Sequence, residues 1–378
     1  MELEHYQKIA VFGFILAALF GAIANRTNFC TMGAISDWVN MGALTRLKVW
    51  LLAMGIALVG TQIMHSTGAI DVTGSIYLST NFTWLGYIVG GFIFGIGMTI
   101  GSGCGQKTLV RVGGGNLKSL VVLIVMGITA YMTLRGLLAL IRLQINDPTT
   151  IDLSESGLAT QGIPDILSAW TGLSSSLLGI VLTVLIGGGA IVYALKDASV
   201  RNNFDHMLSG IGIGLLIAAS WYVTGVLGYD DFEPLPLEGI SFISPVGNTI
   251  SYLMTYTGSV INFGIAVVFG MIAGSFLYAI LTGTFRVESF NDQSDLVHHL
   301  WGGALMGFGG VMALGCTIGQ GVTGMSTLAA GSLIAALSIC LGCAFALKMQ
   351  YYLYDEQGWW HAFKSTMGDV VPSKQKSA

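Results

Sequence analysis

The chain has 378 residues, of which 53% are hydrophobic and only 10% are charged, whereas a soluble globular domain carries about 25% charged residues. This composition excludes an ordinary soluble domain and indicates a single integral membrane domain over residues 1–378. The formal net charge is −4 and no run of lysines and arginines occurs, so we expect no nucleic-acid partner.

Apolar runs long enough to cross a bilayer, roughly 17 to 25 residues each, occur along the whole chain. Two of them, Trp84 to Gly103 and Leu300 to Gly315, are rich in glycine. Glycine inside a bilayer favours close helix packing or a broken, re-entrant segment. We predict an all-α polytopic membrane protein with about nine transmembrane helices. The other seven runs are Ile9 to Ala24, Val49 to Thr67, Ser119 to Ile141, Leu173 to Leu195, Met207 to Leu227, Val260 to Leu281 and Thr327 to Leu347.

Basic residues gather in every second connection between these runs. Arg26, Arg46 and Lys48 lie in one connection, and Lys107 lies in the next basic one. Because cytoplasmic loops carry an excess of lysine and arginine, nine segments place the N-terminus outside and the tail, residues 353–378, in the cytoplasm. The predicted inner side also holds Arg111, Lys118, Lys196, Arg201, Arg286, Lys348, Lys364, Lys374 and Lys376, and the predicted outer side holds Asp147, Asp152, Glu155, Asp165, Asp230, Asp231, Glu233 and Glu238.

The chain contains an internal duplication. Moving it along itself by 212 residues, the difference between positions 90 and 302, superposes a glycine pattern that ends in a cysteine in both copies. The first copy, residues 9–141, has one span more than the second, residues 257–352, so we expect a pseudo-inverted repeat. Residues 142–256 connect the copies. The superposed residues are Gly90, Gly91, Gly95, Gly97, Gly103 and Cys104 on Gly302, Gly303, Gly307, Gly309, Gly315 and Cys316, and, after a two-residue insertion, Gly105 and Gln106 on Gly319 and Gln320.

Cys104 and Cys316 therefore occupy duplicated positions among glycines. Ordinary packing of small residues explains one such cysteine, but the repetition favours broken backbone that lines a path through the membrane. Cys340 and Cys343 lie one helical turn apart in an unbroken apolar run, and we interpret them as packing residues. The five cysteines do not form the even pattern of a disulfide framework.

Catalytic and metal-binding motifs are missing from the sequence. It has no G-x-S-x-G, H-E-x-x-H or Walker motif. His298 and His299 lie near three acidic residues, Glu288, Asp292 and Asp295, but their spacing matches no metal-ligand template. We therefore expect neither an enzyme nor a cofactor.

Three short stretches carry a resemblance to a known family. They read RTNFC from Arg26 to Cys30, GSGCGQ from Gly101 to Gln106, and LGCTIGQG from Leu314 to Gly321. With these motifs in this order among apolar runs, the chain resembles the YeeE/YedE family of sulfur-compound transporters over roughly Ala10 to Met349.

The resemblance implies a bacterial inner-membrane protein with nine or so helices and with loops that dip towards the centre from both sides. In the thiosulfate-importing members, three cysteines of these motifs line the route of the anion, and the matching residues here are Cys30, Cys104 and Cys316. The stretch Gly105 to Lys107 departs from those importers, in which small residues and threonine follow the second cysteine. Other branches are linked to selenium or to unidentified sulfur compounds.

A path of thiols suits the chemistry of such a substrate. Thiosulfate is a dianion, and removing it from water is costly unless each step provides replacement donors. A thiol in apolar surroundings stays as neutral S–H, and weak donors repeated along a path both admit an ion and release it. Helix N-termini at glycine breaks also attract anions. We predict substrate contacts from Cys30, Cys104, Cys316, Arg26, Gln106, Lys107 and Gln320, although positive-inside anchoring also explains Arg26 and Lys107.

Two other functions remain open. The chain could transport another sulfur or selenium species or a small solute, or it could be a membrane sulfurtransferase or redox protein that carries sulfur as a cysteine persulfide. Besides membrane lipid, the expected partner is a small cysteine-bearing sulfur carrier, because some relatives act with one or are fused to one. Little chain follows Tyr354, so we expect any such carrier to be a separate protein.

Overall fold

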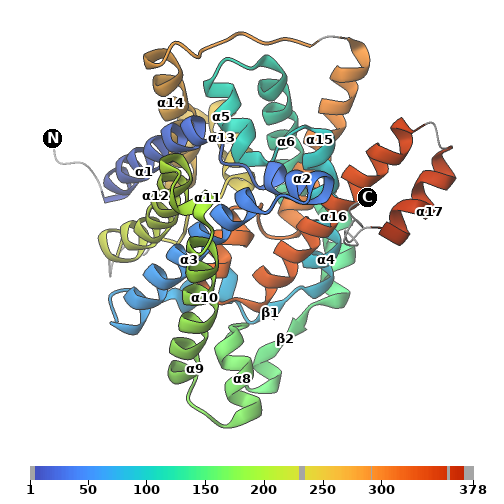
Figure 1. Ribbon diagram of the computed structural model, residues 1–378. Helices are drawn as coiled ribbons and strands as arrows, with labels where there is room; N and C mark the ends of the chain where they lie inside the picture. The colour runs from blue at the N-terminus through green and yellow to red at the C-terminus, as the bar shows by residue number, and fades with distance from the viewer. Residues whose placement is uncertain (1–4, 230–234, 291, 356–357, 370–378) are drawn as a thin grey trace.

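Figure 1 shows the computed structural model, which describes residues 5–229, 235–290, 292–355 and 358–369. Nearly all regular structure is helical, which confirms the all-α prediction. One small antiparallel ladder joins β1 (Asn81–Phe82) to β2 (Ile151–Asp152). Five residues assigned to a side of the membrane above lie outside the described residues: Asp230, Asp231, Glu233, Lys374 and Lys376.

Eight helical segments of the described chain are long and apolar enough to cross a membrane. Helix α15 (Gln293–Met312), with 20 residues, covers the one remaining expected run, Leu300 to Gly315. The polytopic architecture is therefore confirmed. Four of the segments coincide with one helix, and the other four are joined through a tight break or a π-helical turn. They are α1 (His5–Thr27) with α2 (Thr31–Met41), α3 (Thr45–Ser66), α4 (Trp84–Ile100) with α5 (Gly105–Gly113), α6 (Leu117–Arg135), α9 (Ser175–Leu182) with η5 (Thr183–Gly188) and α10 (Gly189–Leu195), α12 (Phe204–Tyr222) with η6 (Val223–Leu227), α14 (Phe263–Leu281) and α16 (Ala330–Tyr354).

The prediction of one span from Ser119 to Ile141 is wrong. Helix α6 ends at Arg135, because Gly136 adopts an extended conformation (φ −109°, ψ −156°), and α7 (Leu138–Asn146) follows as a separate helix. Several short elements were also not anticipated from the apolar runs. They are α8 (Ile163–Thr171), α11 (Ala198–Arg201), α13 (Ile243–Met254), α17 (Trp359–Asp369), the π-helical segment η8 (Gly319–Gly324) and the 3-10 turns η1 (Val72–Gly74), η2 (Ile76–Leu78), η3 (Asp147–Thr149), η4 (Leu153–Ser156), η7 (Tyr256–Gly258) and η9 (Met325–Thr327).

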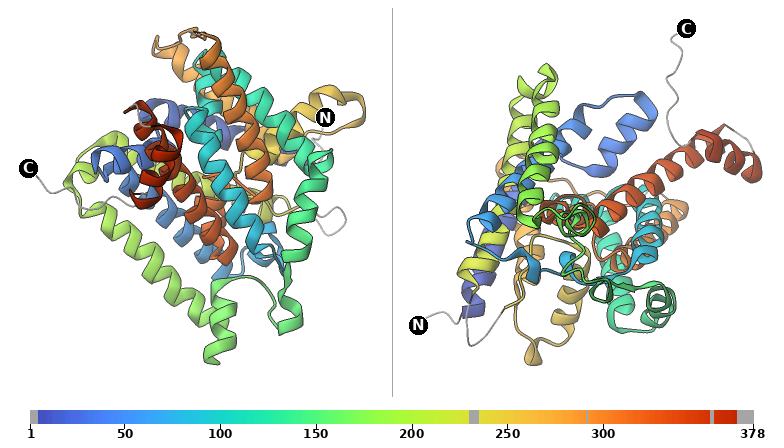
Figure 2. Two further views of the ribbon diagram at one scale, coloured as in Figure 1. Left: turned by 90° about the vertical axis from the view of Figure 1, so that its right-hand side faces the viewer. Right: turned by 90° about the horizontal axis from the view of Figure 1, so that it is seen from below.

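Helices α4 and α15 cross at glycines, and α6 and α16 flank this pair (Figure 2). A Cβ on Gly90 would lie 2.8 Å from the carbonyl oxygen of Gly309, and one on Gly309 would lie 2.6 Å from that of Gly90. Gly97 and Gly302 make the same reciprocal approach, at 3.0 Å in both directions. The contact is reciprocal between superposed glycines, as a two-fold relation between the two segments requires.

Four other superposed glycines, Gly91, Gly95, Gly303 and Gly307, face the flanking helices. A Cβ on Gly95 would lie 2.3 Å from the carbonyl oxygen of Ile339 on α16, and one on Gly307 would lie 2.4 Å from that of Met126 on α6. Such close backbone approach is available only to glycine. These contacts fix the ends of α4 and α15, where both helices break, deep inside the bundle.

Candidate functional site

All three predicted path cysteines follow a break of the same shape. A helix ends, one residue adopts a left-handed conformation, and the cysteine stands two positions later. Left-handed backbone is strained for residues other than glycine, so the repeated use of this device marks the three places as special. The left-handed residues before Cys30, Cys104 and Cys316 are Asn28, Ser102 and Leu314, with φ of 52°, 57° and 56°.

Two of the thiols cap the helical turn that follows them. The sulfur of Cys30 accepts a hydrogen bond from the Gly33 N–H at 3.5 Å, and the sulfur of Cys316 accepts one from the Gly319 N–H at 3.3 Å. In both cases a free N–H group at the start of a helical turn points at the thiol. Cys104 occupies the same N-cap position before α5, without a regular cap hydrogen bond.

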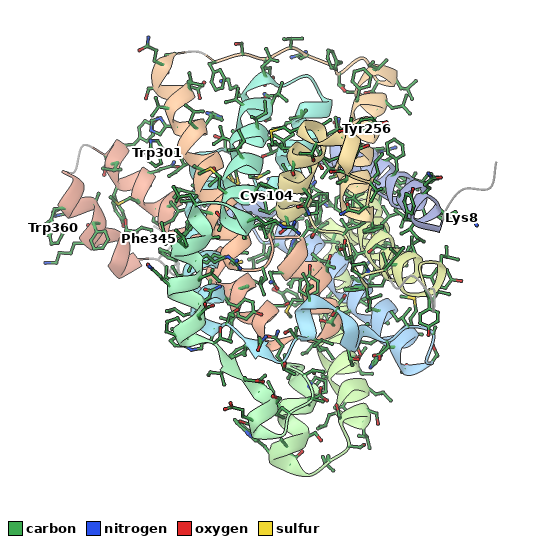
Figure 3. The ribbon with its side chains drawn as sticks, turned by 180° about the vertical axis from the view of Figure 1, so that it is seen from behind. Lys8, Cys104, Tyr256, Trp301, Phe345 and Trp360 are labelled. Carbon is green, nitrogen blue, oxygen red and sulfur yellow. The ribbon has the colours of Figure 1, made fainter. Side chains whose placement is uncertain are left out.

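The breaks bring the three cysteines into one buried region, which lies near the middle of the molecule (Figure 3). The thiols of Cys30 and Cys104 lie next to each other. Cys104 also contacts the hydroxyl of Thr317, which directly follows Cys316. Cys104 therefore lies between the other two breaks.

Positive charge borders the Cys30 side of this region. Lys107 is only 9% exposed, and its Nζ donates to Asn28 Oδ1 at 2.9 Å. Arg46 donates to the Asn28 carbonyl oxygen at 3.1 Å, and Arg111 donates to that of Ser102 at 2.6 Å. The ion pairs of the described residues include none between Lys107 and a carboxylate. Because buried charges in proteins are normally paired, this ammonium group favours an anion as its partner.

Buried donors without a regular hydrogen bond lie beside the same cysteines. They are Gln106 Nε2 and the hydroxyls of Thr31 and Thr317. The other end of the Gln106 side chain accepts from Cys104 at 3.8 Å, and Thr31 directly follows Cys30. A buried donor that lacks an acceptor costs about 1–3 kcal/mol, so these groups are suited to an anion that arrives and leaves.

Two predicted site residues are already bonded to other protein groups. Arg26, which we expected near the centre, pairs with Asp205 at 2.9 Å and lies over the Phe204 ring, with 43% of its side chain exposed. Gln320 is buried, but its amide is engaged at both ends in holding the third break. Its Nε2 donates to the Ala313 carbonyl at 2.6 Å, and its Oε1 accepts from Ser332 at 2.6 Å.

A small cavity of about 100 Å³ borders the third break at Leu314 and Gly315. Tyr77 and Ser241 line it and also contact Gly319, whose N–H caps Cys316. The cavity therefore ends next to the Cys316 thiol. We call it the vestibule; its main polar and break residues are Tyr77, Glu238, Ser241, Asn248, Asn262 and Gly315.

Glu238 is the acidic group of the vestibule. It lies between η6 and α13, outside the spanning helices, and burial raises the pKa of its carboxyl group. The structure pairs it with no basic side chain among the residues it describes. The other titratable group of the vestibule, Tyr77, also has a raised pKa because it is buried. Glu238 therefore takes up a proton, and removes the negative charge of the vestibule, at a higher pH than an exposed carboxyl group does.

Sequence reasoning found the cysteines but missed most of their neighbours. Asn28 and Thr317 lie inside the quoted motifs, but nothing in the sequence distinguishes them as neighbours of the cysteines, and most vestibule residues come from segments without a motif. One signal was available at the first break, because asparagine is enriched in the left-handed conformation. Cys343 accepts from Thr99 at 3.3 Å within the contact between α16 and α4, close to the second break.

Comparison with known proteins agrees with this geometry. The sulphur transport family matches residues 26–345, which include all three breaks. The chain belongs to this family. It is 29% identical over 324 residues to the thiosulfate transporter TsuA of Escherichia coli, covering 82% of this chain and 86% of that protein. It is 24% identical over 334 residues to the thiosulfate transporter TsuA of Spirochaeta thermophila, covering 87% and 96%.

The contact between two thiols predicts which disulfide a mild oxidant forms in this family member. Treating the purified protein with copper phenanthroline should join Cys30 to Cys104, because their sulfurs need only a small approach to reach the S–S distance of about 2.05 Å. Peptide mass spectrometry identifies the pair. Cys104→Ala should leave Cys30 as a free thiol, and a parent protein that joins Cys30 to any other cysteine instead contradicts the geometry.

Proposed function

We propose that this chain takes up a sulfur-containing anion, thiosulfate, across a bacterial inner membrane by stepwise passage along cysteine thiols. Membership of the sulphur transport family supports the class of function, and the names of two relatives support the substrate. The proposal includes the orientation expected from the charges, with the N-terminus outside and the C-terminus in the cytoplasm.

The observation that carries this proposal is a buried ammonium beside two thiols. Lys107 has an amide oxygen, that of Asn28, as its partner and no carboxylate among the described residues. A group that only anchored the chain to the inner surface would be exposed or paired with an acid. A transported anion supplies the missing countercharge at this position.

The contacts suggest an order for the path. An anion entering through the vestibule first meets Cys316, then Cys104, then Cys30, because Cys104 contacts both Thr317 and Cys30. It leaves past the cationic groups around Asn28. With the proposed orientation, the acidic vestibule is outside and the basic exit inside.

Neutral thiols and backbone N–H groups make each step shallow. A fixed charge in the middle of the path would hold a dianion too tightly, whereas conduction needs sites that bind weakly and lie close together. The helical turns that begin after Cys30, Cys104 and Cys316 add N–H donors without a fixed charge. The arrangement thus replaces part of the water around the anion at every step.

We also propose that residues 9–141 and 257–352 are two inverted copies. The reciprocal contacts of Gly90 with Gly309, and of Gly97 with Gly302, support this relation. Inverted repeats place a shared site near the midplane, and we propose that the buried cysteines after α4 and α15 form this site. The break at Cys30 belongs to the first copy alone.

Uptake by a sulfur-auxotrophic host supplied only with thiosulfate tests the path. Because losing about 1.4 kcal/mol at one step slows that step about tenfold, Cys104→Ala and Cys316→Ala should each reduce uptake roughly tenfold or more. Uptake by Lys107→Met, which keeps the length of the side chain without its charge, should also be well below that of the parent. Cys340→Ala is the matched control and should transport like the parent at equal membrane abundance.

Three outcomes oppose different parts of the proposal. If Cys104→Ala and Cys316→Ala both transport like the parent, passage along thiols is wrong. If proteoliposomes take up a selenium or other sulfur anion and exclude thiosulfate, the substrate is wrong while the path can stand. A persulfide on Cys104 after exposure to substrate indicates a sulfurtransferase instead.

The vestibule predicts a pH dependence. An ionised Glu238 repels an entering dianion, and protonation removes this repulsion, so uptake should rise several-fold as the pH falls from about 8 towards the raised pKa of Glu238. Proteoliposomes held at equal pH on both sides separate this effect from a proton gradient. Uptake by Glu238→Gln should be fast at every pH. Glu155→Gln, which changes an exposed acid, should keep the pH profile of the parent. A Glu238→Gln protein with the parent's pH profile would show that another group is responsible.

A further inference from the structure

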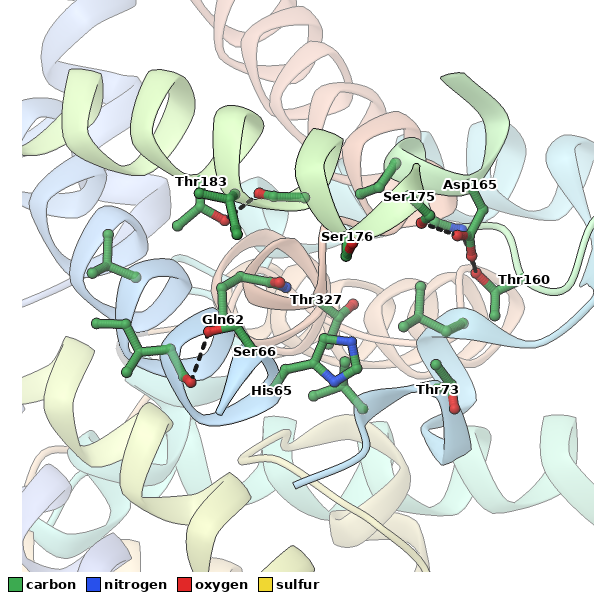
Figure 4. Close-up of a pocket in the computed structure, with 18 of the residues that line it drawn as sticks. Gln62, His65, Ser66, Thr73, Thr160, Asp165, Ser175, Ser176, Thr183 and Thr327 are labelled. Atoms are coloured by element: carbon green, nitrogen blue, oxygen red, sulfur yellow. Dashed lines mark hydrogen bonds between the residues drawn. The ribbon is translucent and has the colours of Figure 1, made fainter. Parts of the chain in front are cut away.

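A second cavity lies apart from the cysteines, between α3 and the helix formed by α9, η5 and α10 (Figure 4). Its volume is about 730 Å³, within the roughly 300–1,000 Å³ of pockets that enclose small-molecule ligands. Residues from the connection before α8 and Thr327 complete the wall. The proposed path uses none of these residues.

The cavity opens because the two helices diverge. At one end they touch, and a Cβ on Gly55 would lie 2.8 Å from the Gly187 carbonyl oxygen. Towards the start of α9 they separate, and the nearest atom to a Cβ on Gly179 belongs to Pro164, at 3.9 Å. Both helices are candidate membrane spans, so the gap between them faces the hydrocarbon of the bilayer.

The length of the cavity matches an acyl chain. It follows the helix from Ser175 to Gly188, a distance of about 20 Å at 1.5 Å per residue. The hydrocarbon core of a bilayer is about 30 Å thick, so an occupant reaching from the polar end to the far wall passes the midplane. A single extended acyl chain has this shape and length.

Deep polar groups in the wall are satisfied within the protein. Gln62 donates to the Ser326 carbonyl at 3.0 Å, and Thr183 donates to the Gly179 carbonyl at 2.7 Å. The Thr327 hydroxyl also bonds a backbone carbonyl, at 2.8 Å. These groups do not need a polar occupant, and the space between them is suited to hydrocarbon.

The polar end of the cavity carries a negative charge. Helix α3 ends at Ser66 and α9 begins at Ser175, and because the helices are antiparallel these ends lie at the same end of the cavity. There the Asp165 carboxylate accepts hydrogen bonds from Thr160 and Ser175 (Figure 4). A carboxylate offers about four acceptor positions, so Asp165 retains capacity for a cation. No lysine or arginine occurs among the described residues that line the cavity.

We propose that this cavity binds one acyl chain of an aminophospholipid, whose ammonium headgroup lies at Asp165. The apolar depth selects a hydrocarbon chain, and the acidic rim selects a lipid that carries an amine over one with a net negative charge. The bound chain fills the gap and supports the contact of α3 with η9, which holds the connection after the third break. This inference stands independently of the transported substrate.

Native mass spectrometry in detergent tests the site with two probes, phosphatidylethanolamine and phosphatidylglycerol with identical acyl chains. We expect one phosphatidylethanolamine to bind about tenfold more tightly than phosphatidylglycerol, a difference in binding free energy of about 1.4 kcal/mol. Gly188→Leu, which fills the cavity, should weaken this binding at least about tenfold. Gly189→Leu is the matched control, because a Cβ on either glycine would meet no heavy atom within 4 Å and only Gly188 lines the cavity.

Asp165→Asn should keep a bound lipid and lose the preference between the two headgroups. Circular dichroism and size-exclusion chromatography confirm that each variant is folded. Equal or tighter binding of phosphatidylglycerol to the parent overturns the assignment of the headgroup. Binding to Gly188→Leu at the level of the parent overturns the assignment of the cavity, as does a dimer in which a second copy fills it.

Discussion

A backbone N–H or carbonyl left unpaired in hydrocarbon costs several kcal/mol, and this cost constrains the whole site. The chain nevertheless leaves helical geometry where three helices end inside the bundle. Protein groups at the breaks meet the requirement: the Gly103 N–H bonds the carbonyl of Met98 at 2.9 Å, and the Gly315 N–H bonds that of Gly310 at 2.8 Å. The sulfurs of Cys30 and Cys316 also accept N–H groups of the next turn. The thiols therefore both stabilise the breaks and provide weak donors, and the tight glycine crossing of α4 and α15 keeps the breaks in place.

Charge is arranged so that little of it is fixed along the middle of the path. In the proposed path the basic groups lie around Asn28 at one end and the acidic Glu238 lies at the other, with the thiols between them. An anion entering past a protonated acid and leaving past an unpaired ammonium would move towards positive charge throughout. The large cavity beside α3 has the opposite chemistry, with satisfied polar groups and an acidic rim, which is why it fits a lipid and does not fit the transported anion.

The fold class, the positions of the spans and the three cysteines could be predicted from the sequence, because apolar length and repeated glycines are local signals. The break at Gly136 could not, since a glycine in an apolar run is equally typical of packing. Arg26 was expected near the centre because it is close to Cys30 in the chain. The sequence could not show that Asp205 of α12 pairs with it instead. The same holds for Thr317 and Glu238, whose roles depend on contacts between distant segments. Gln320 was found by repetition, but only the structure shows that its amide is already satisfied.

A structure of the protein soaked with selenosulfate, in which a selenium atom replaces the terminal sulfur of thiosulfate, would test passage along the thiols most directly. Anomalous scattering then locates the ion without ambiguity. We expect selenium among Cys316, Cys104 and Cys30, with its nearest cation at Lys107. Selenium found only in the cavity between α3 and α9, or only on the surface, would contradict a path along the thiols.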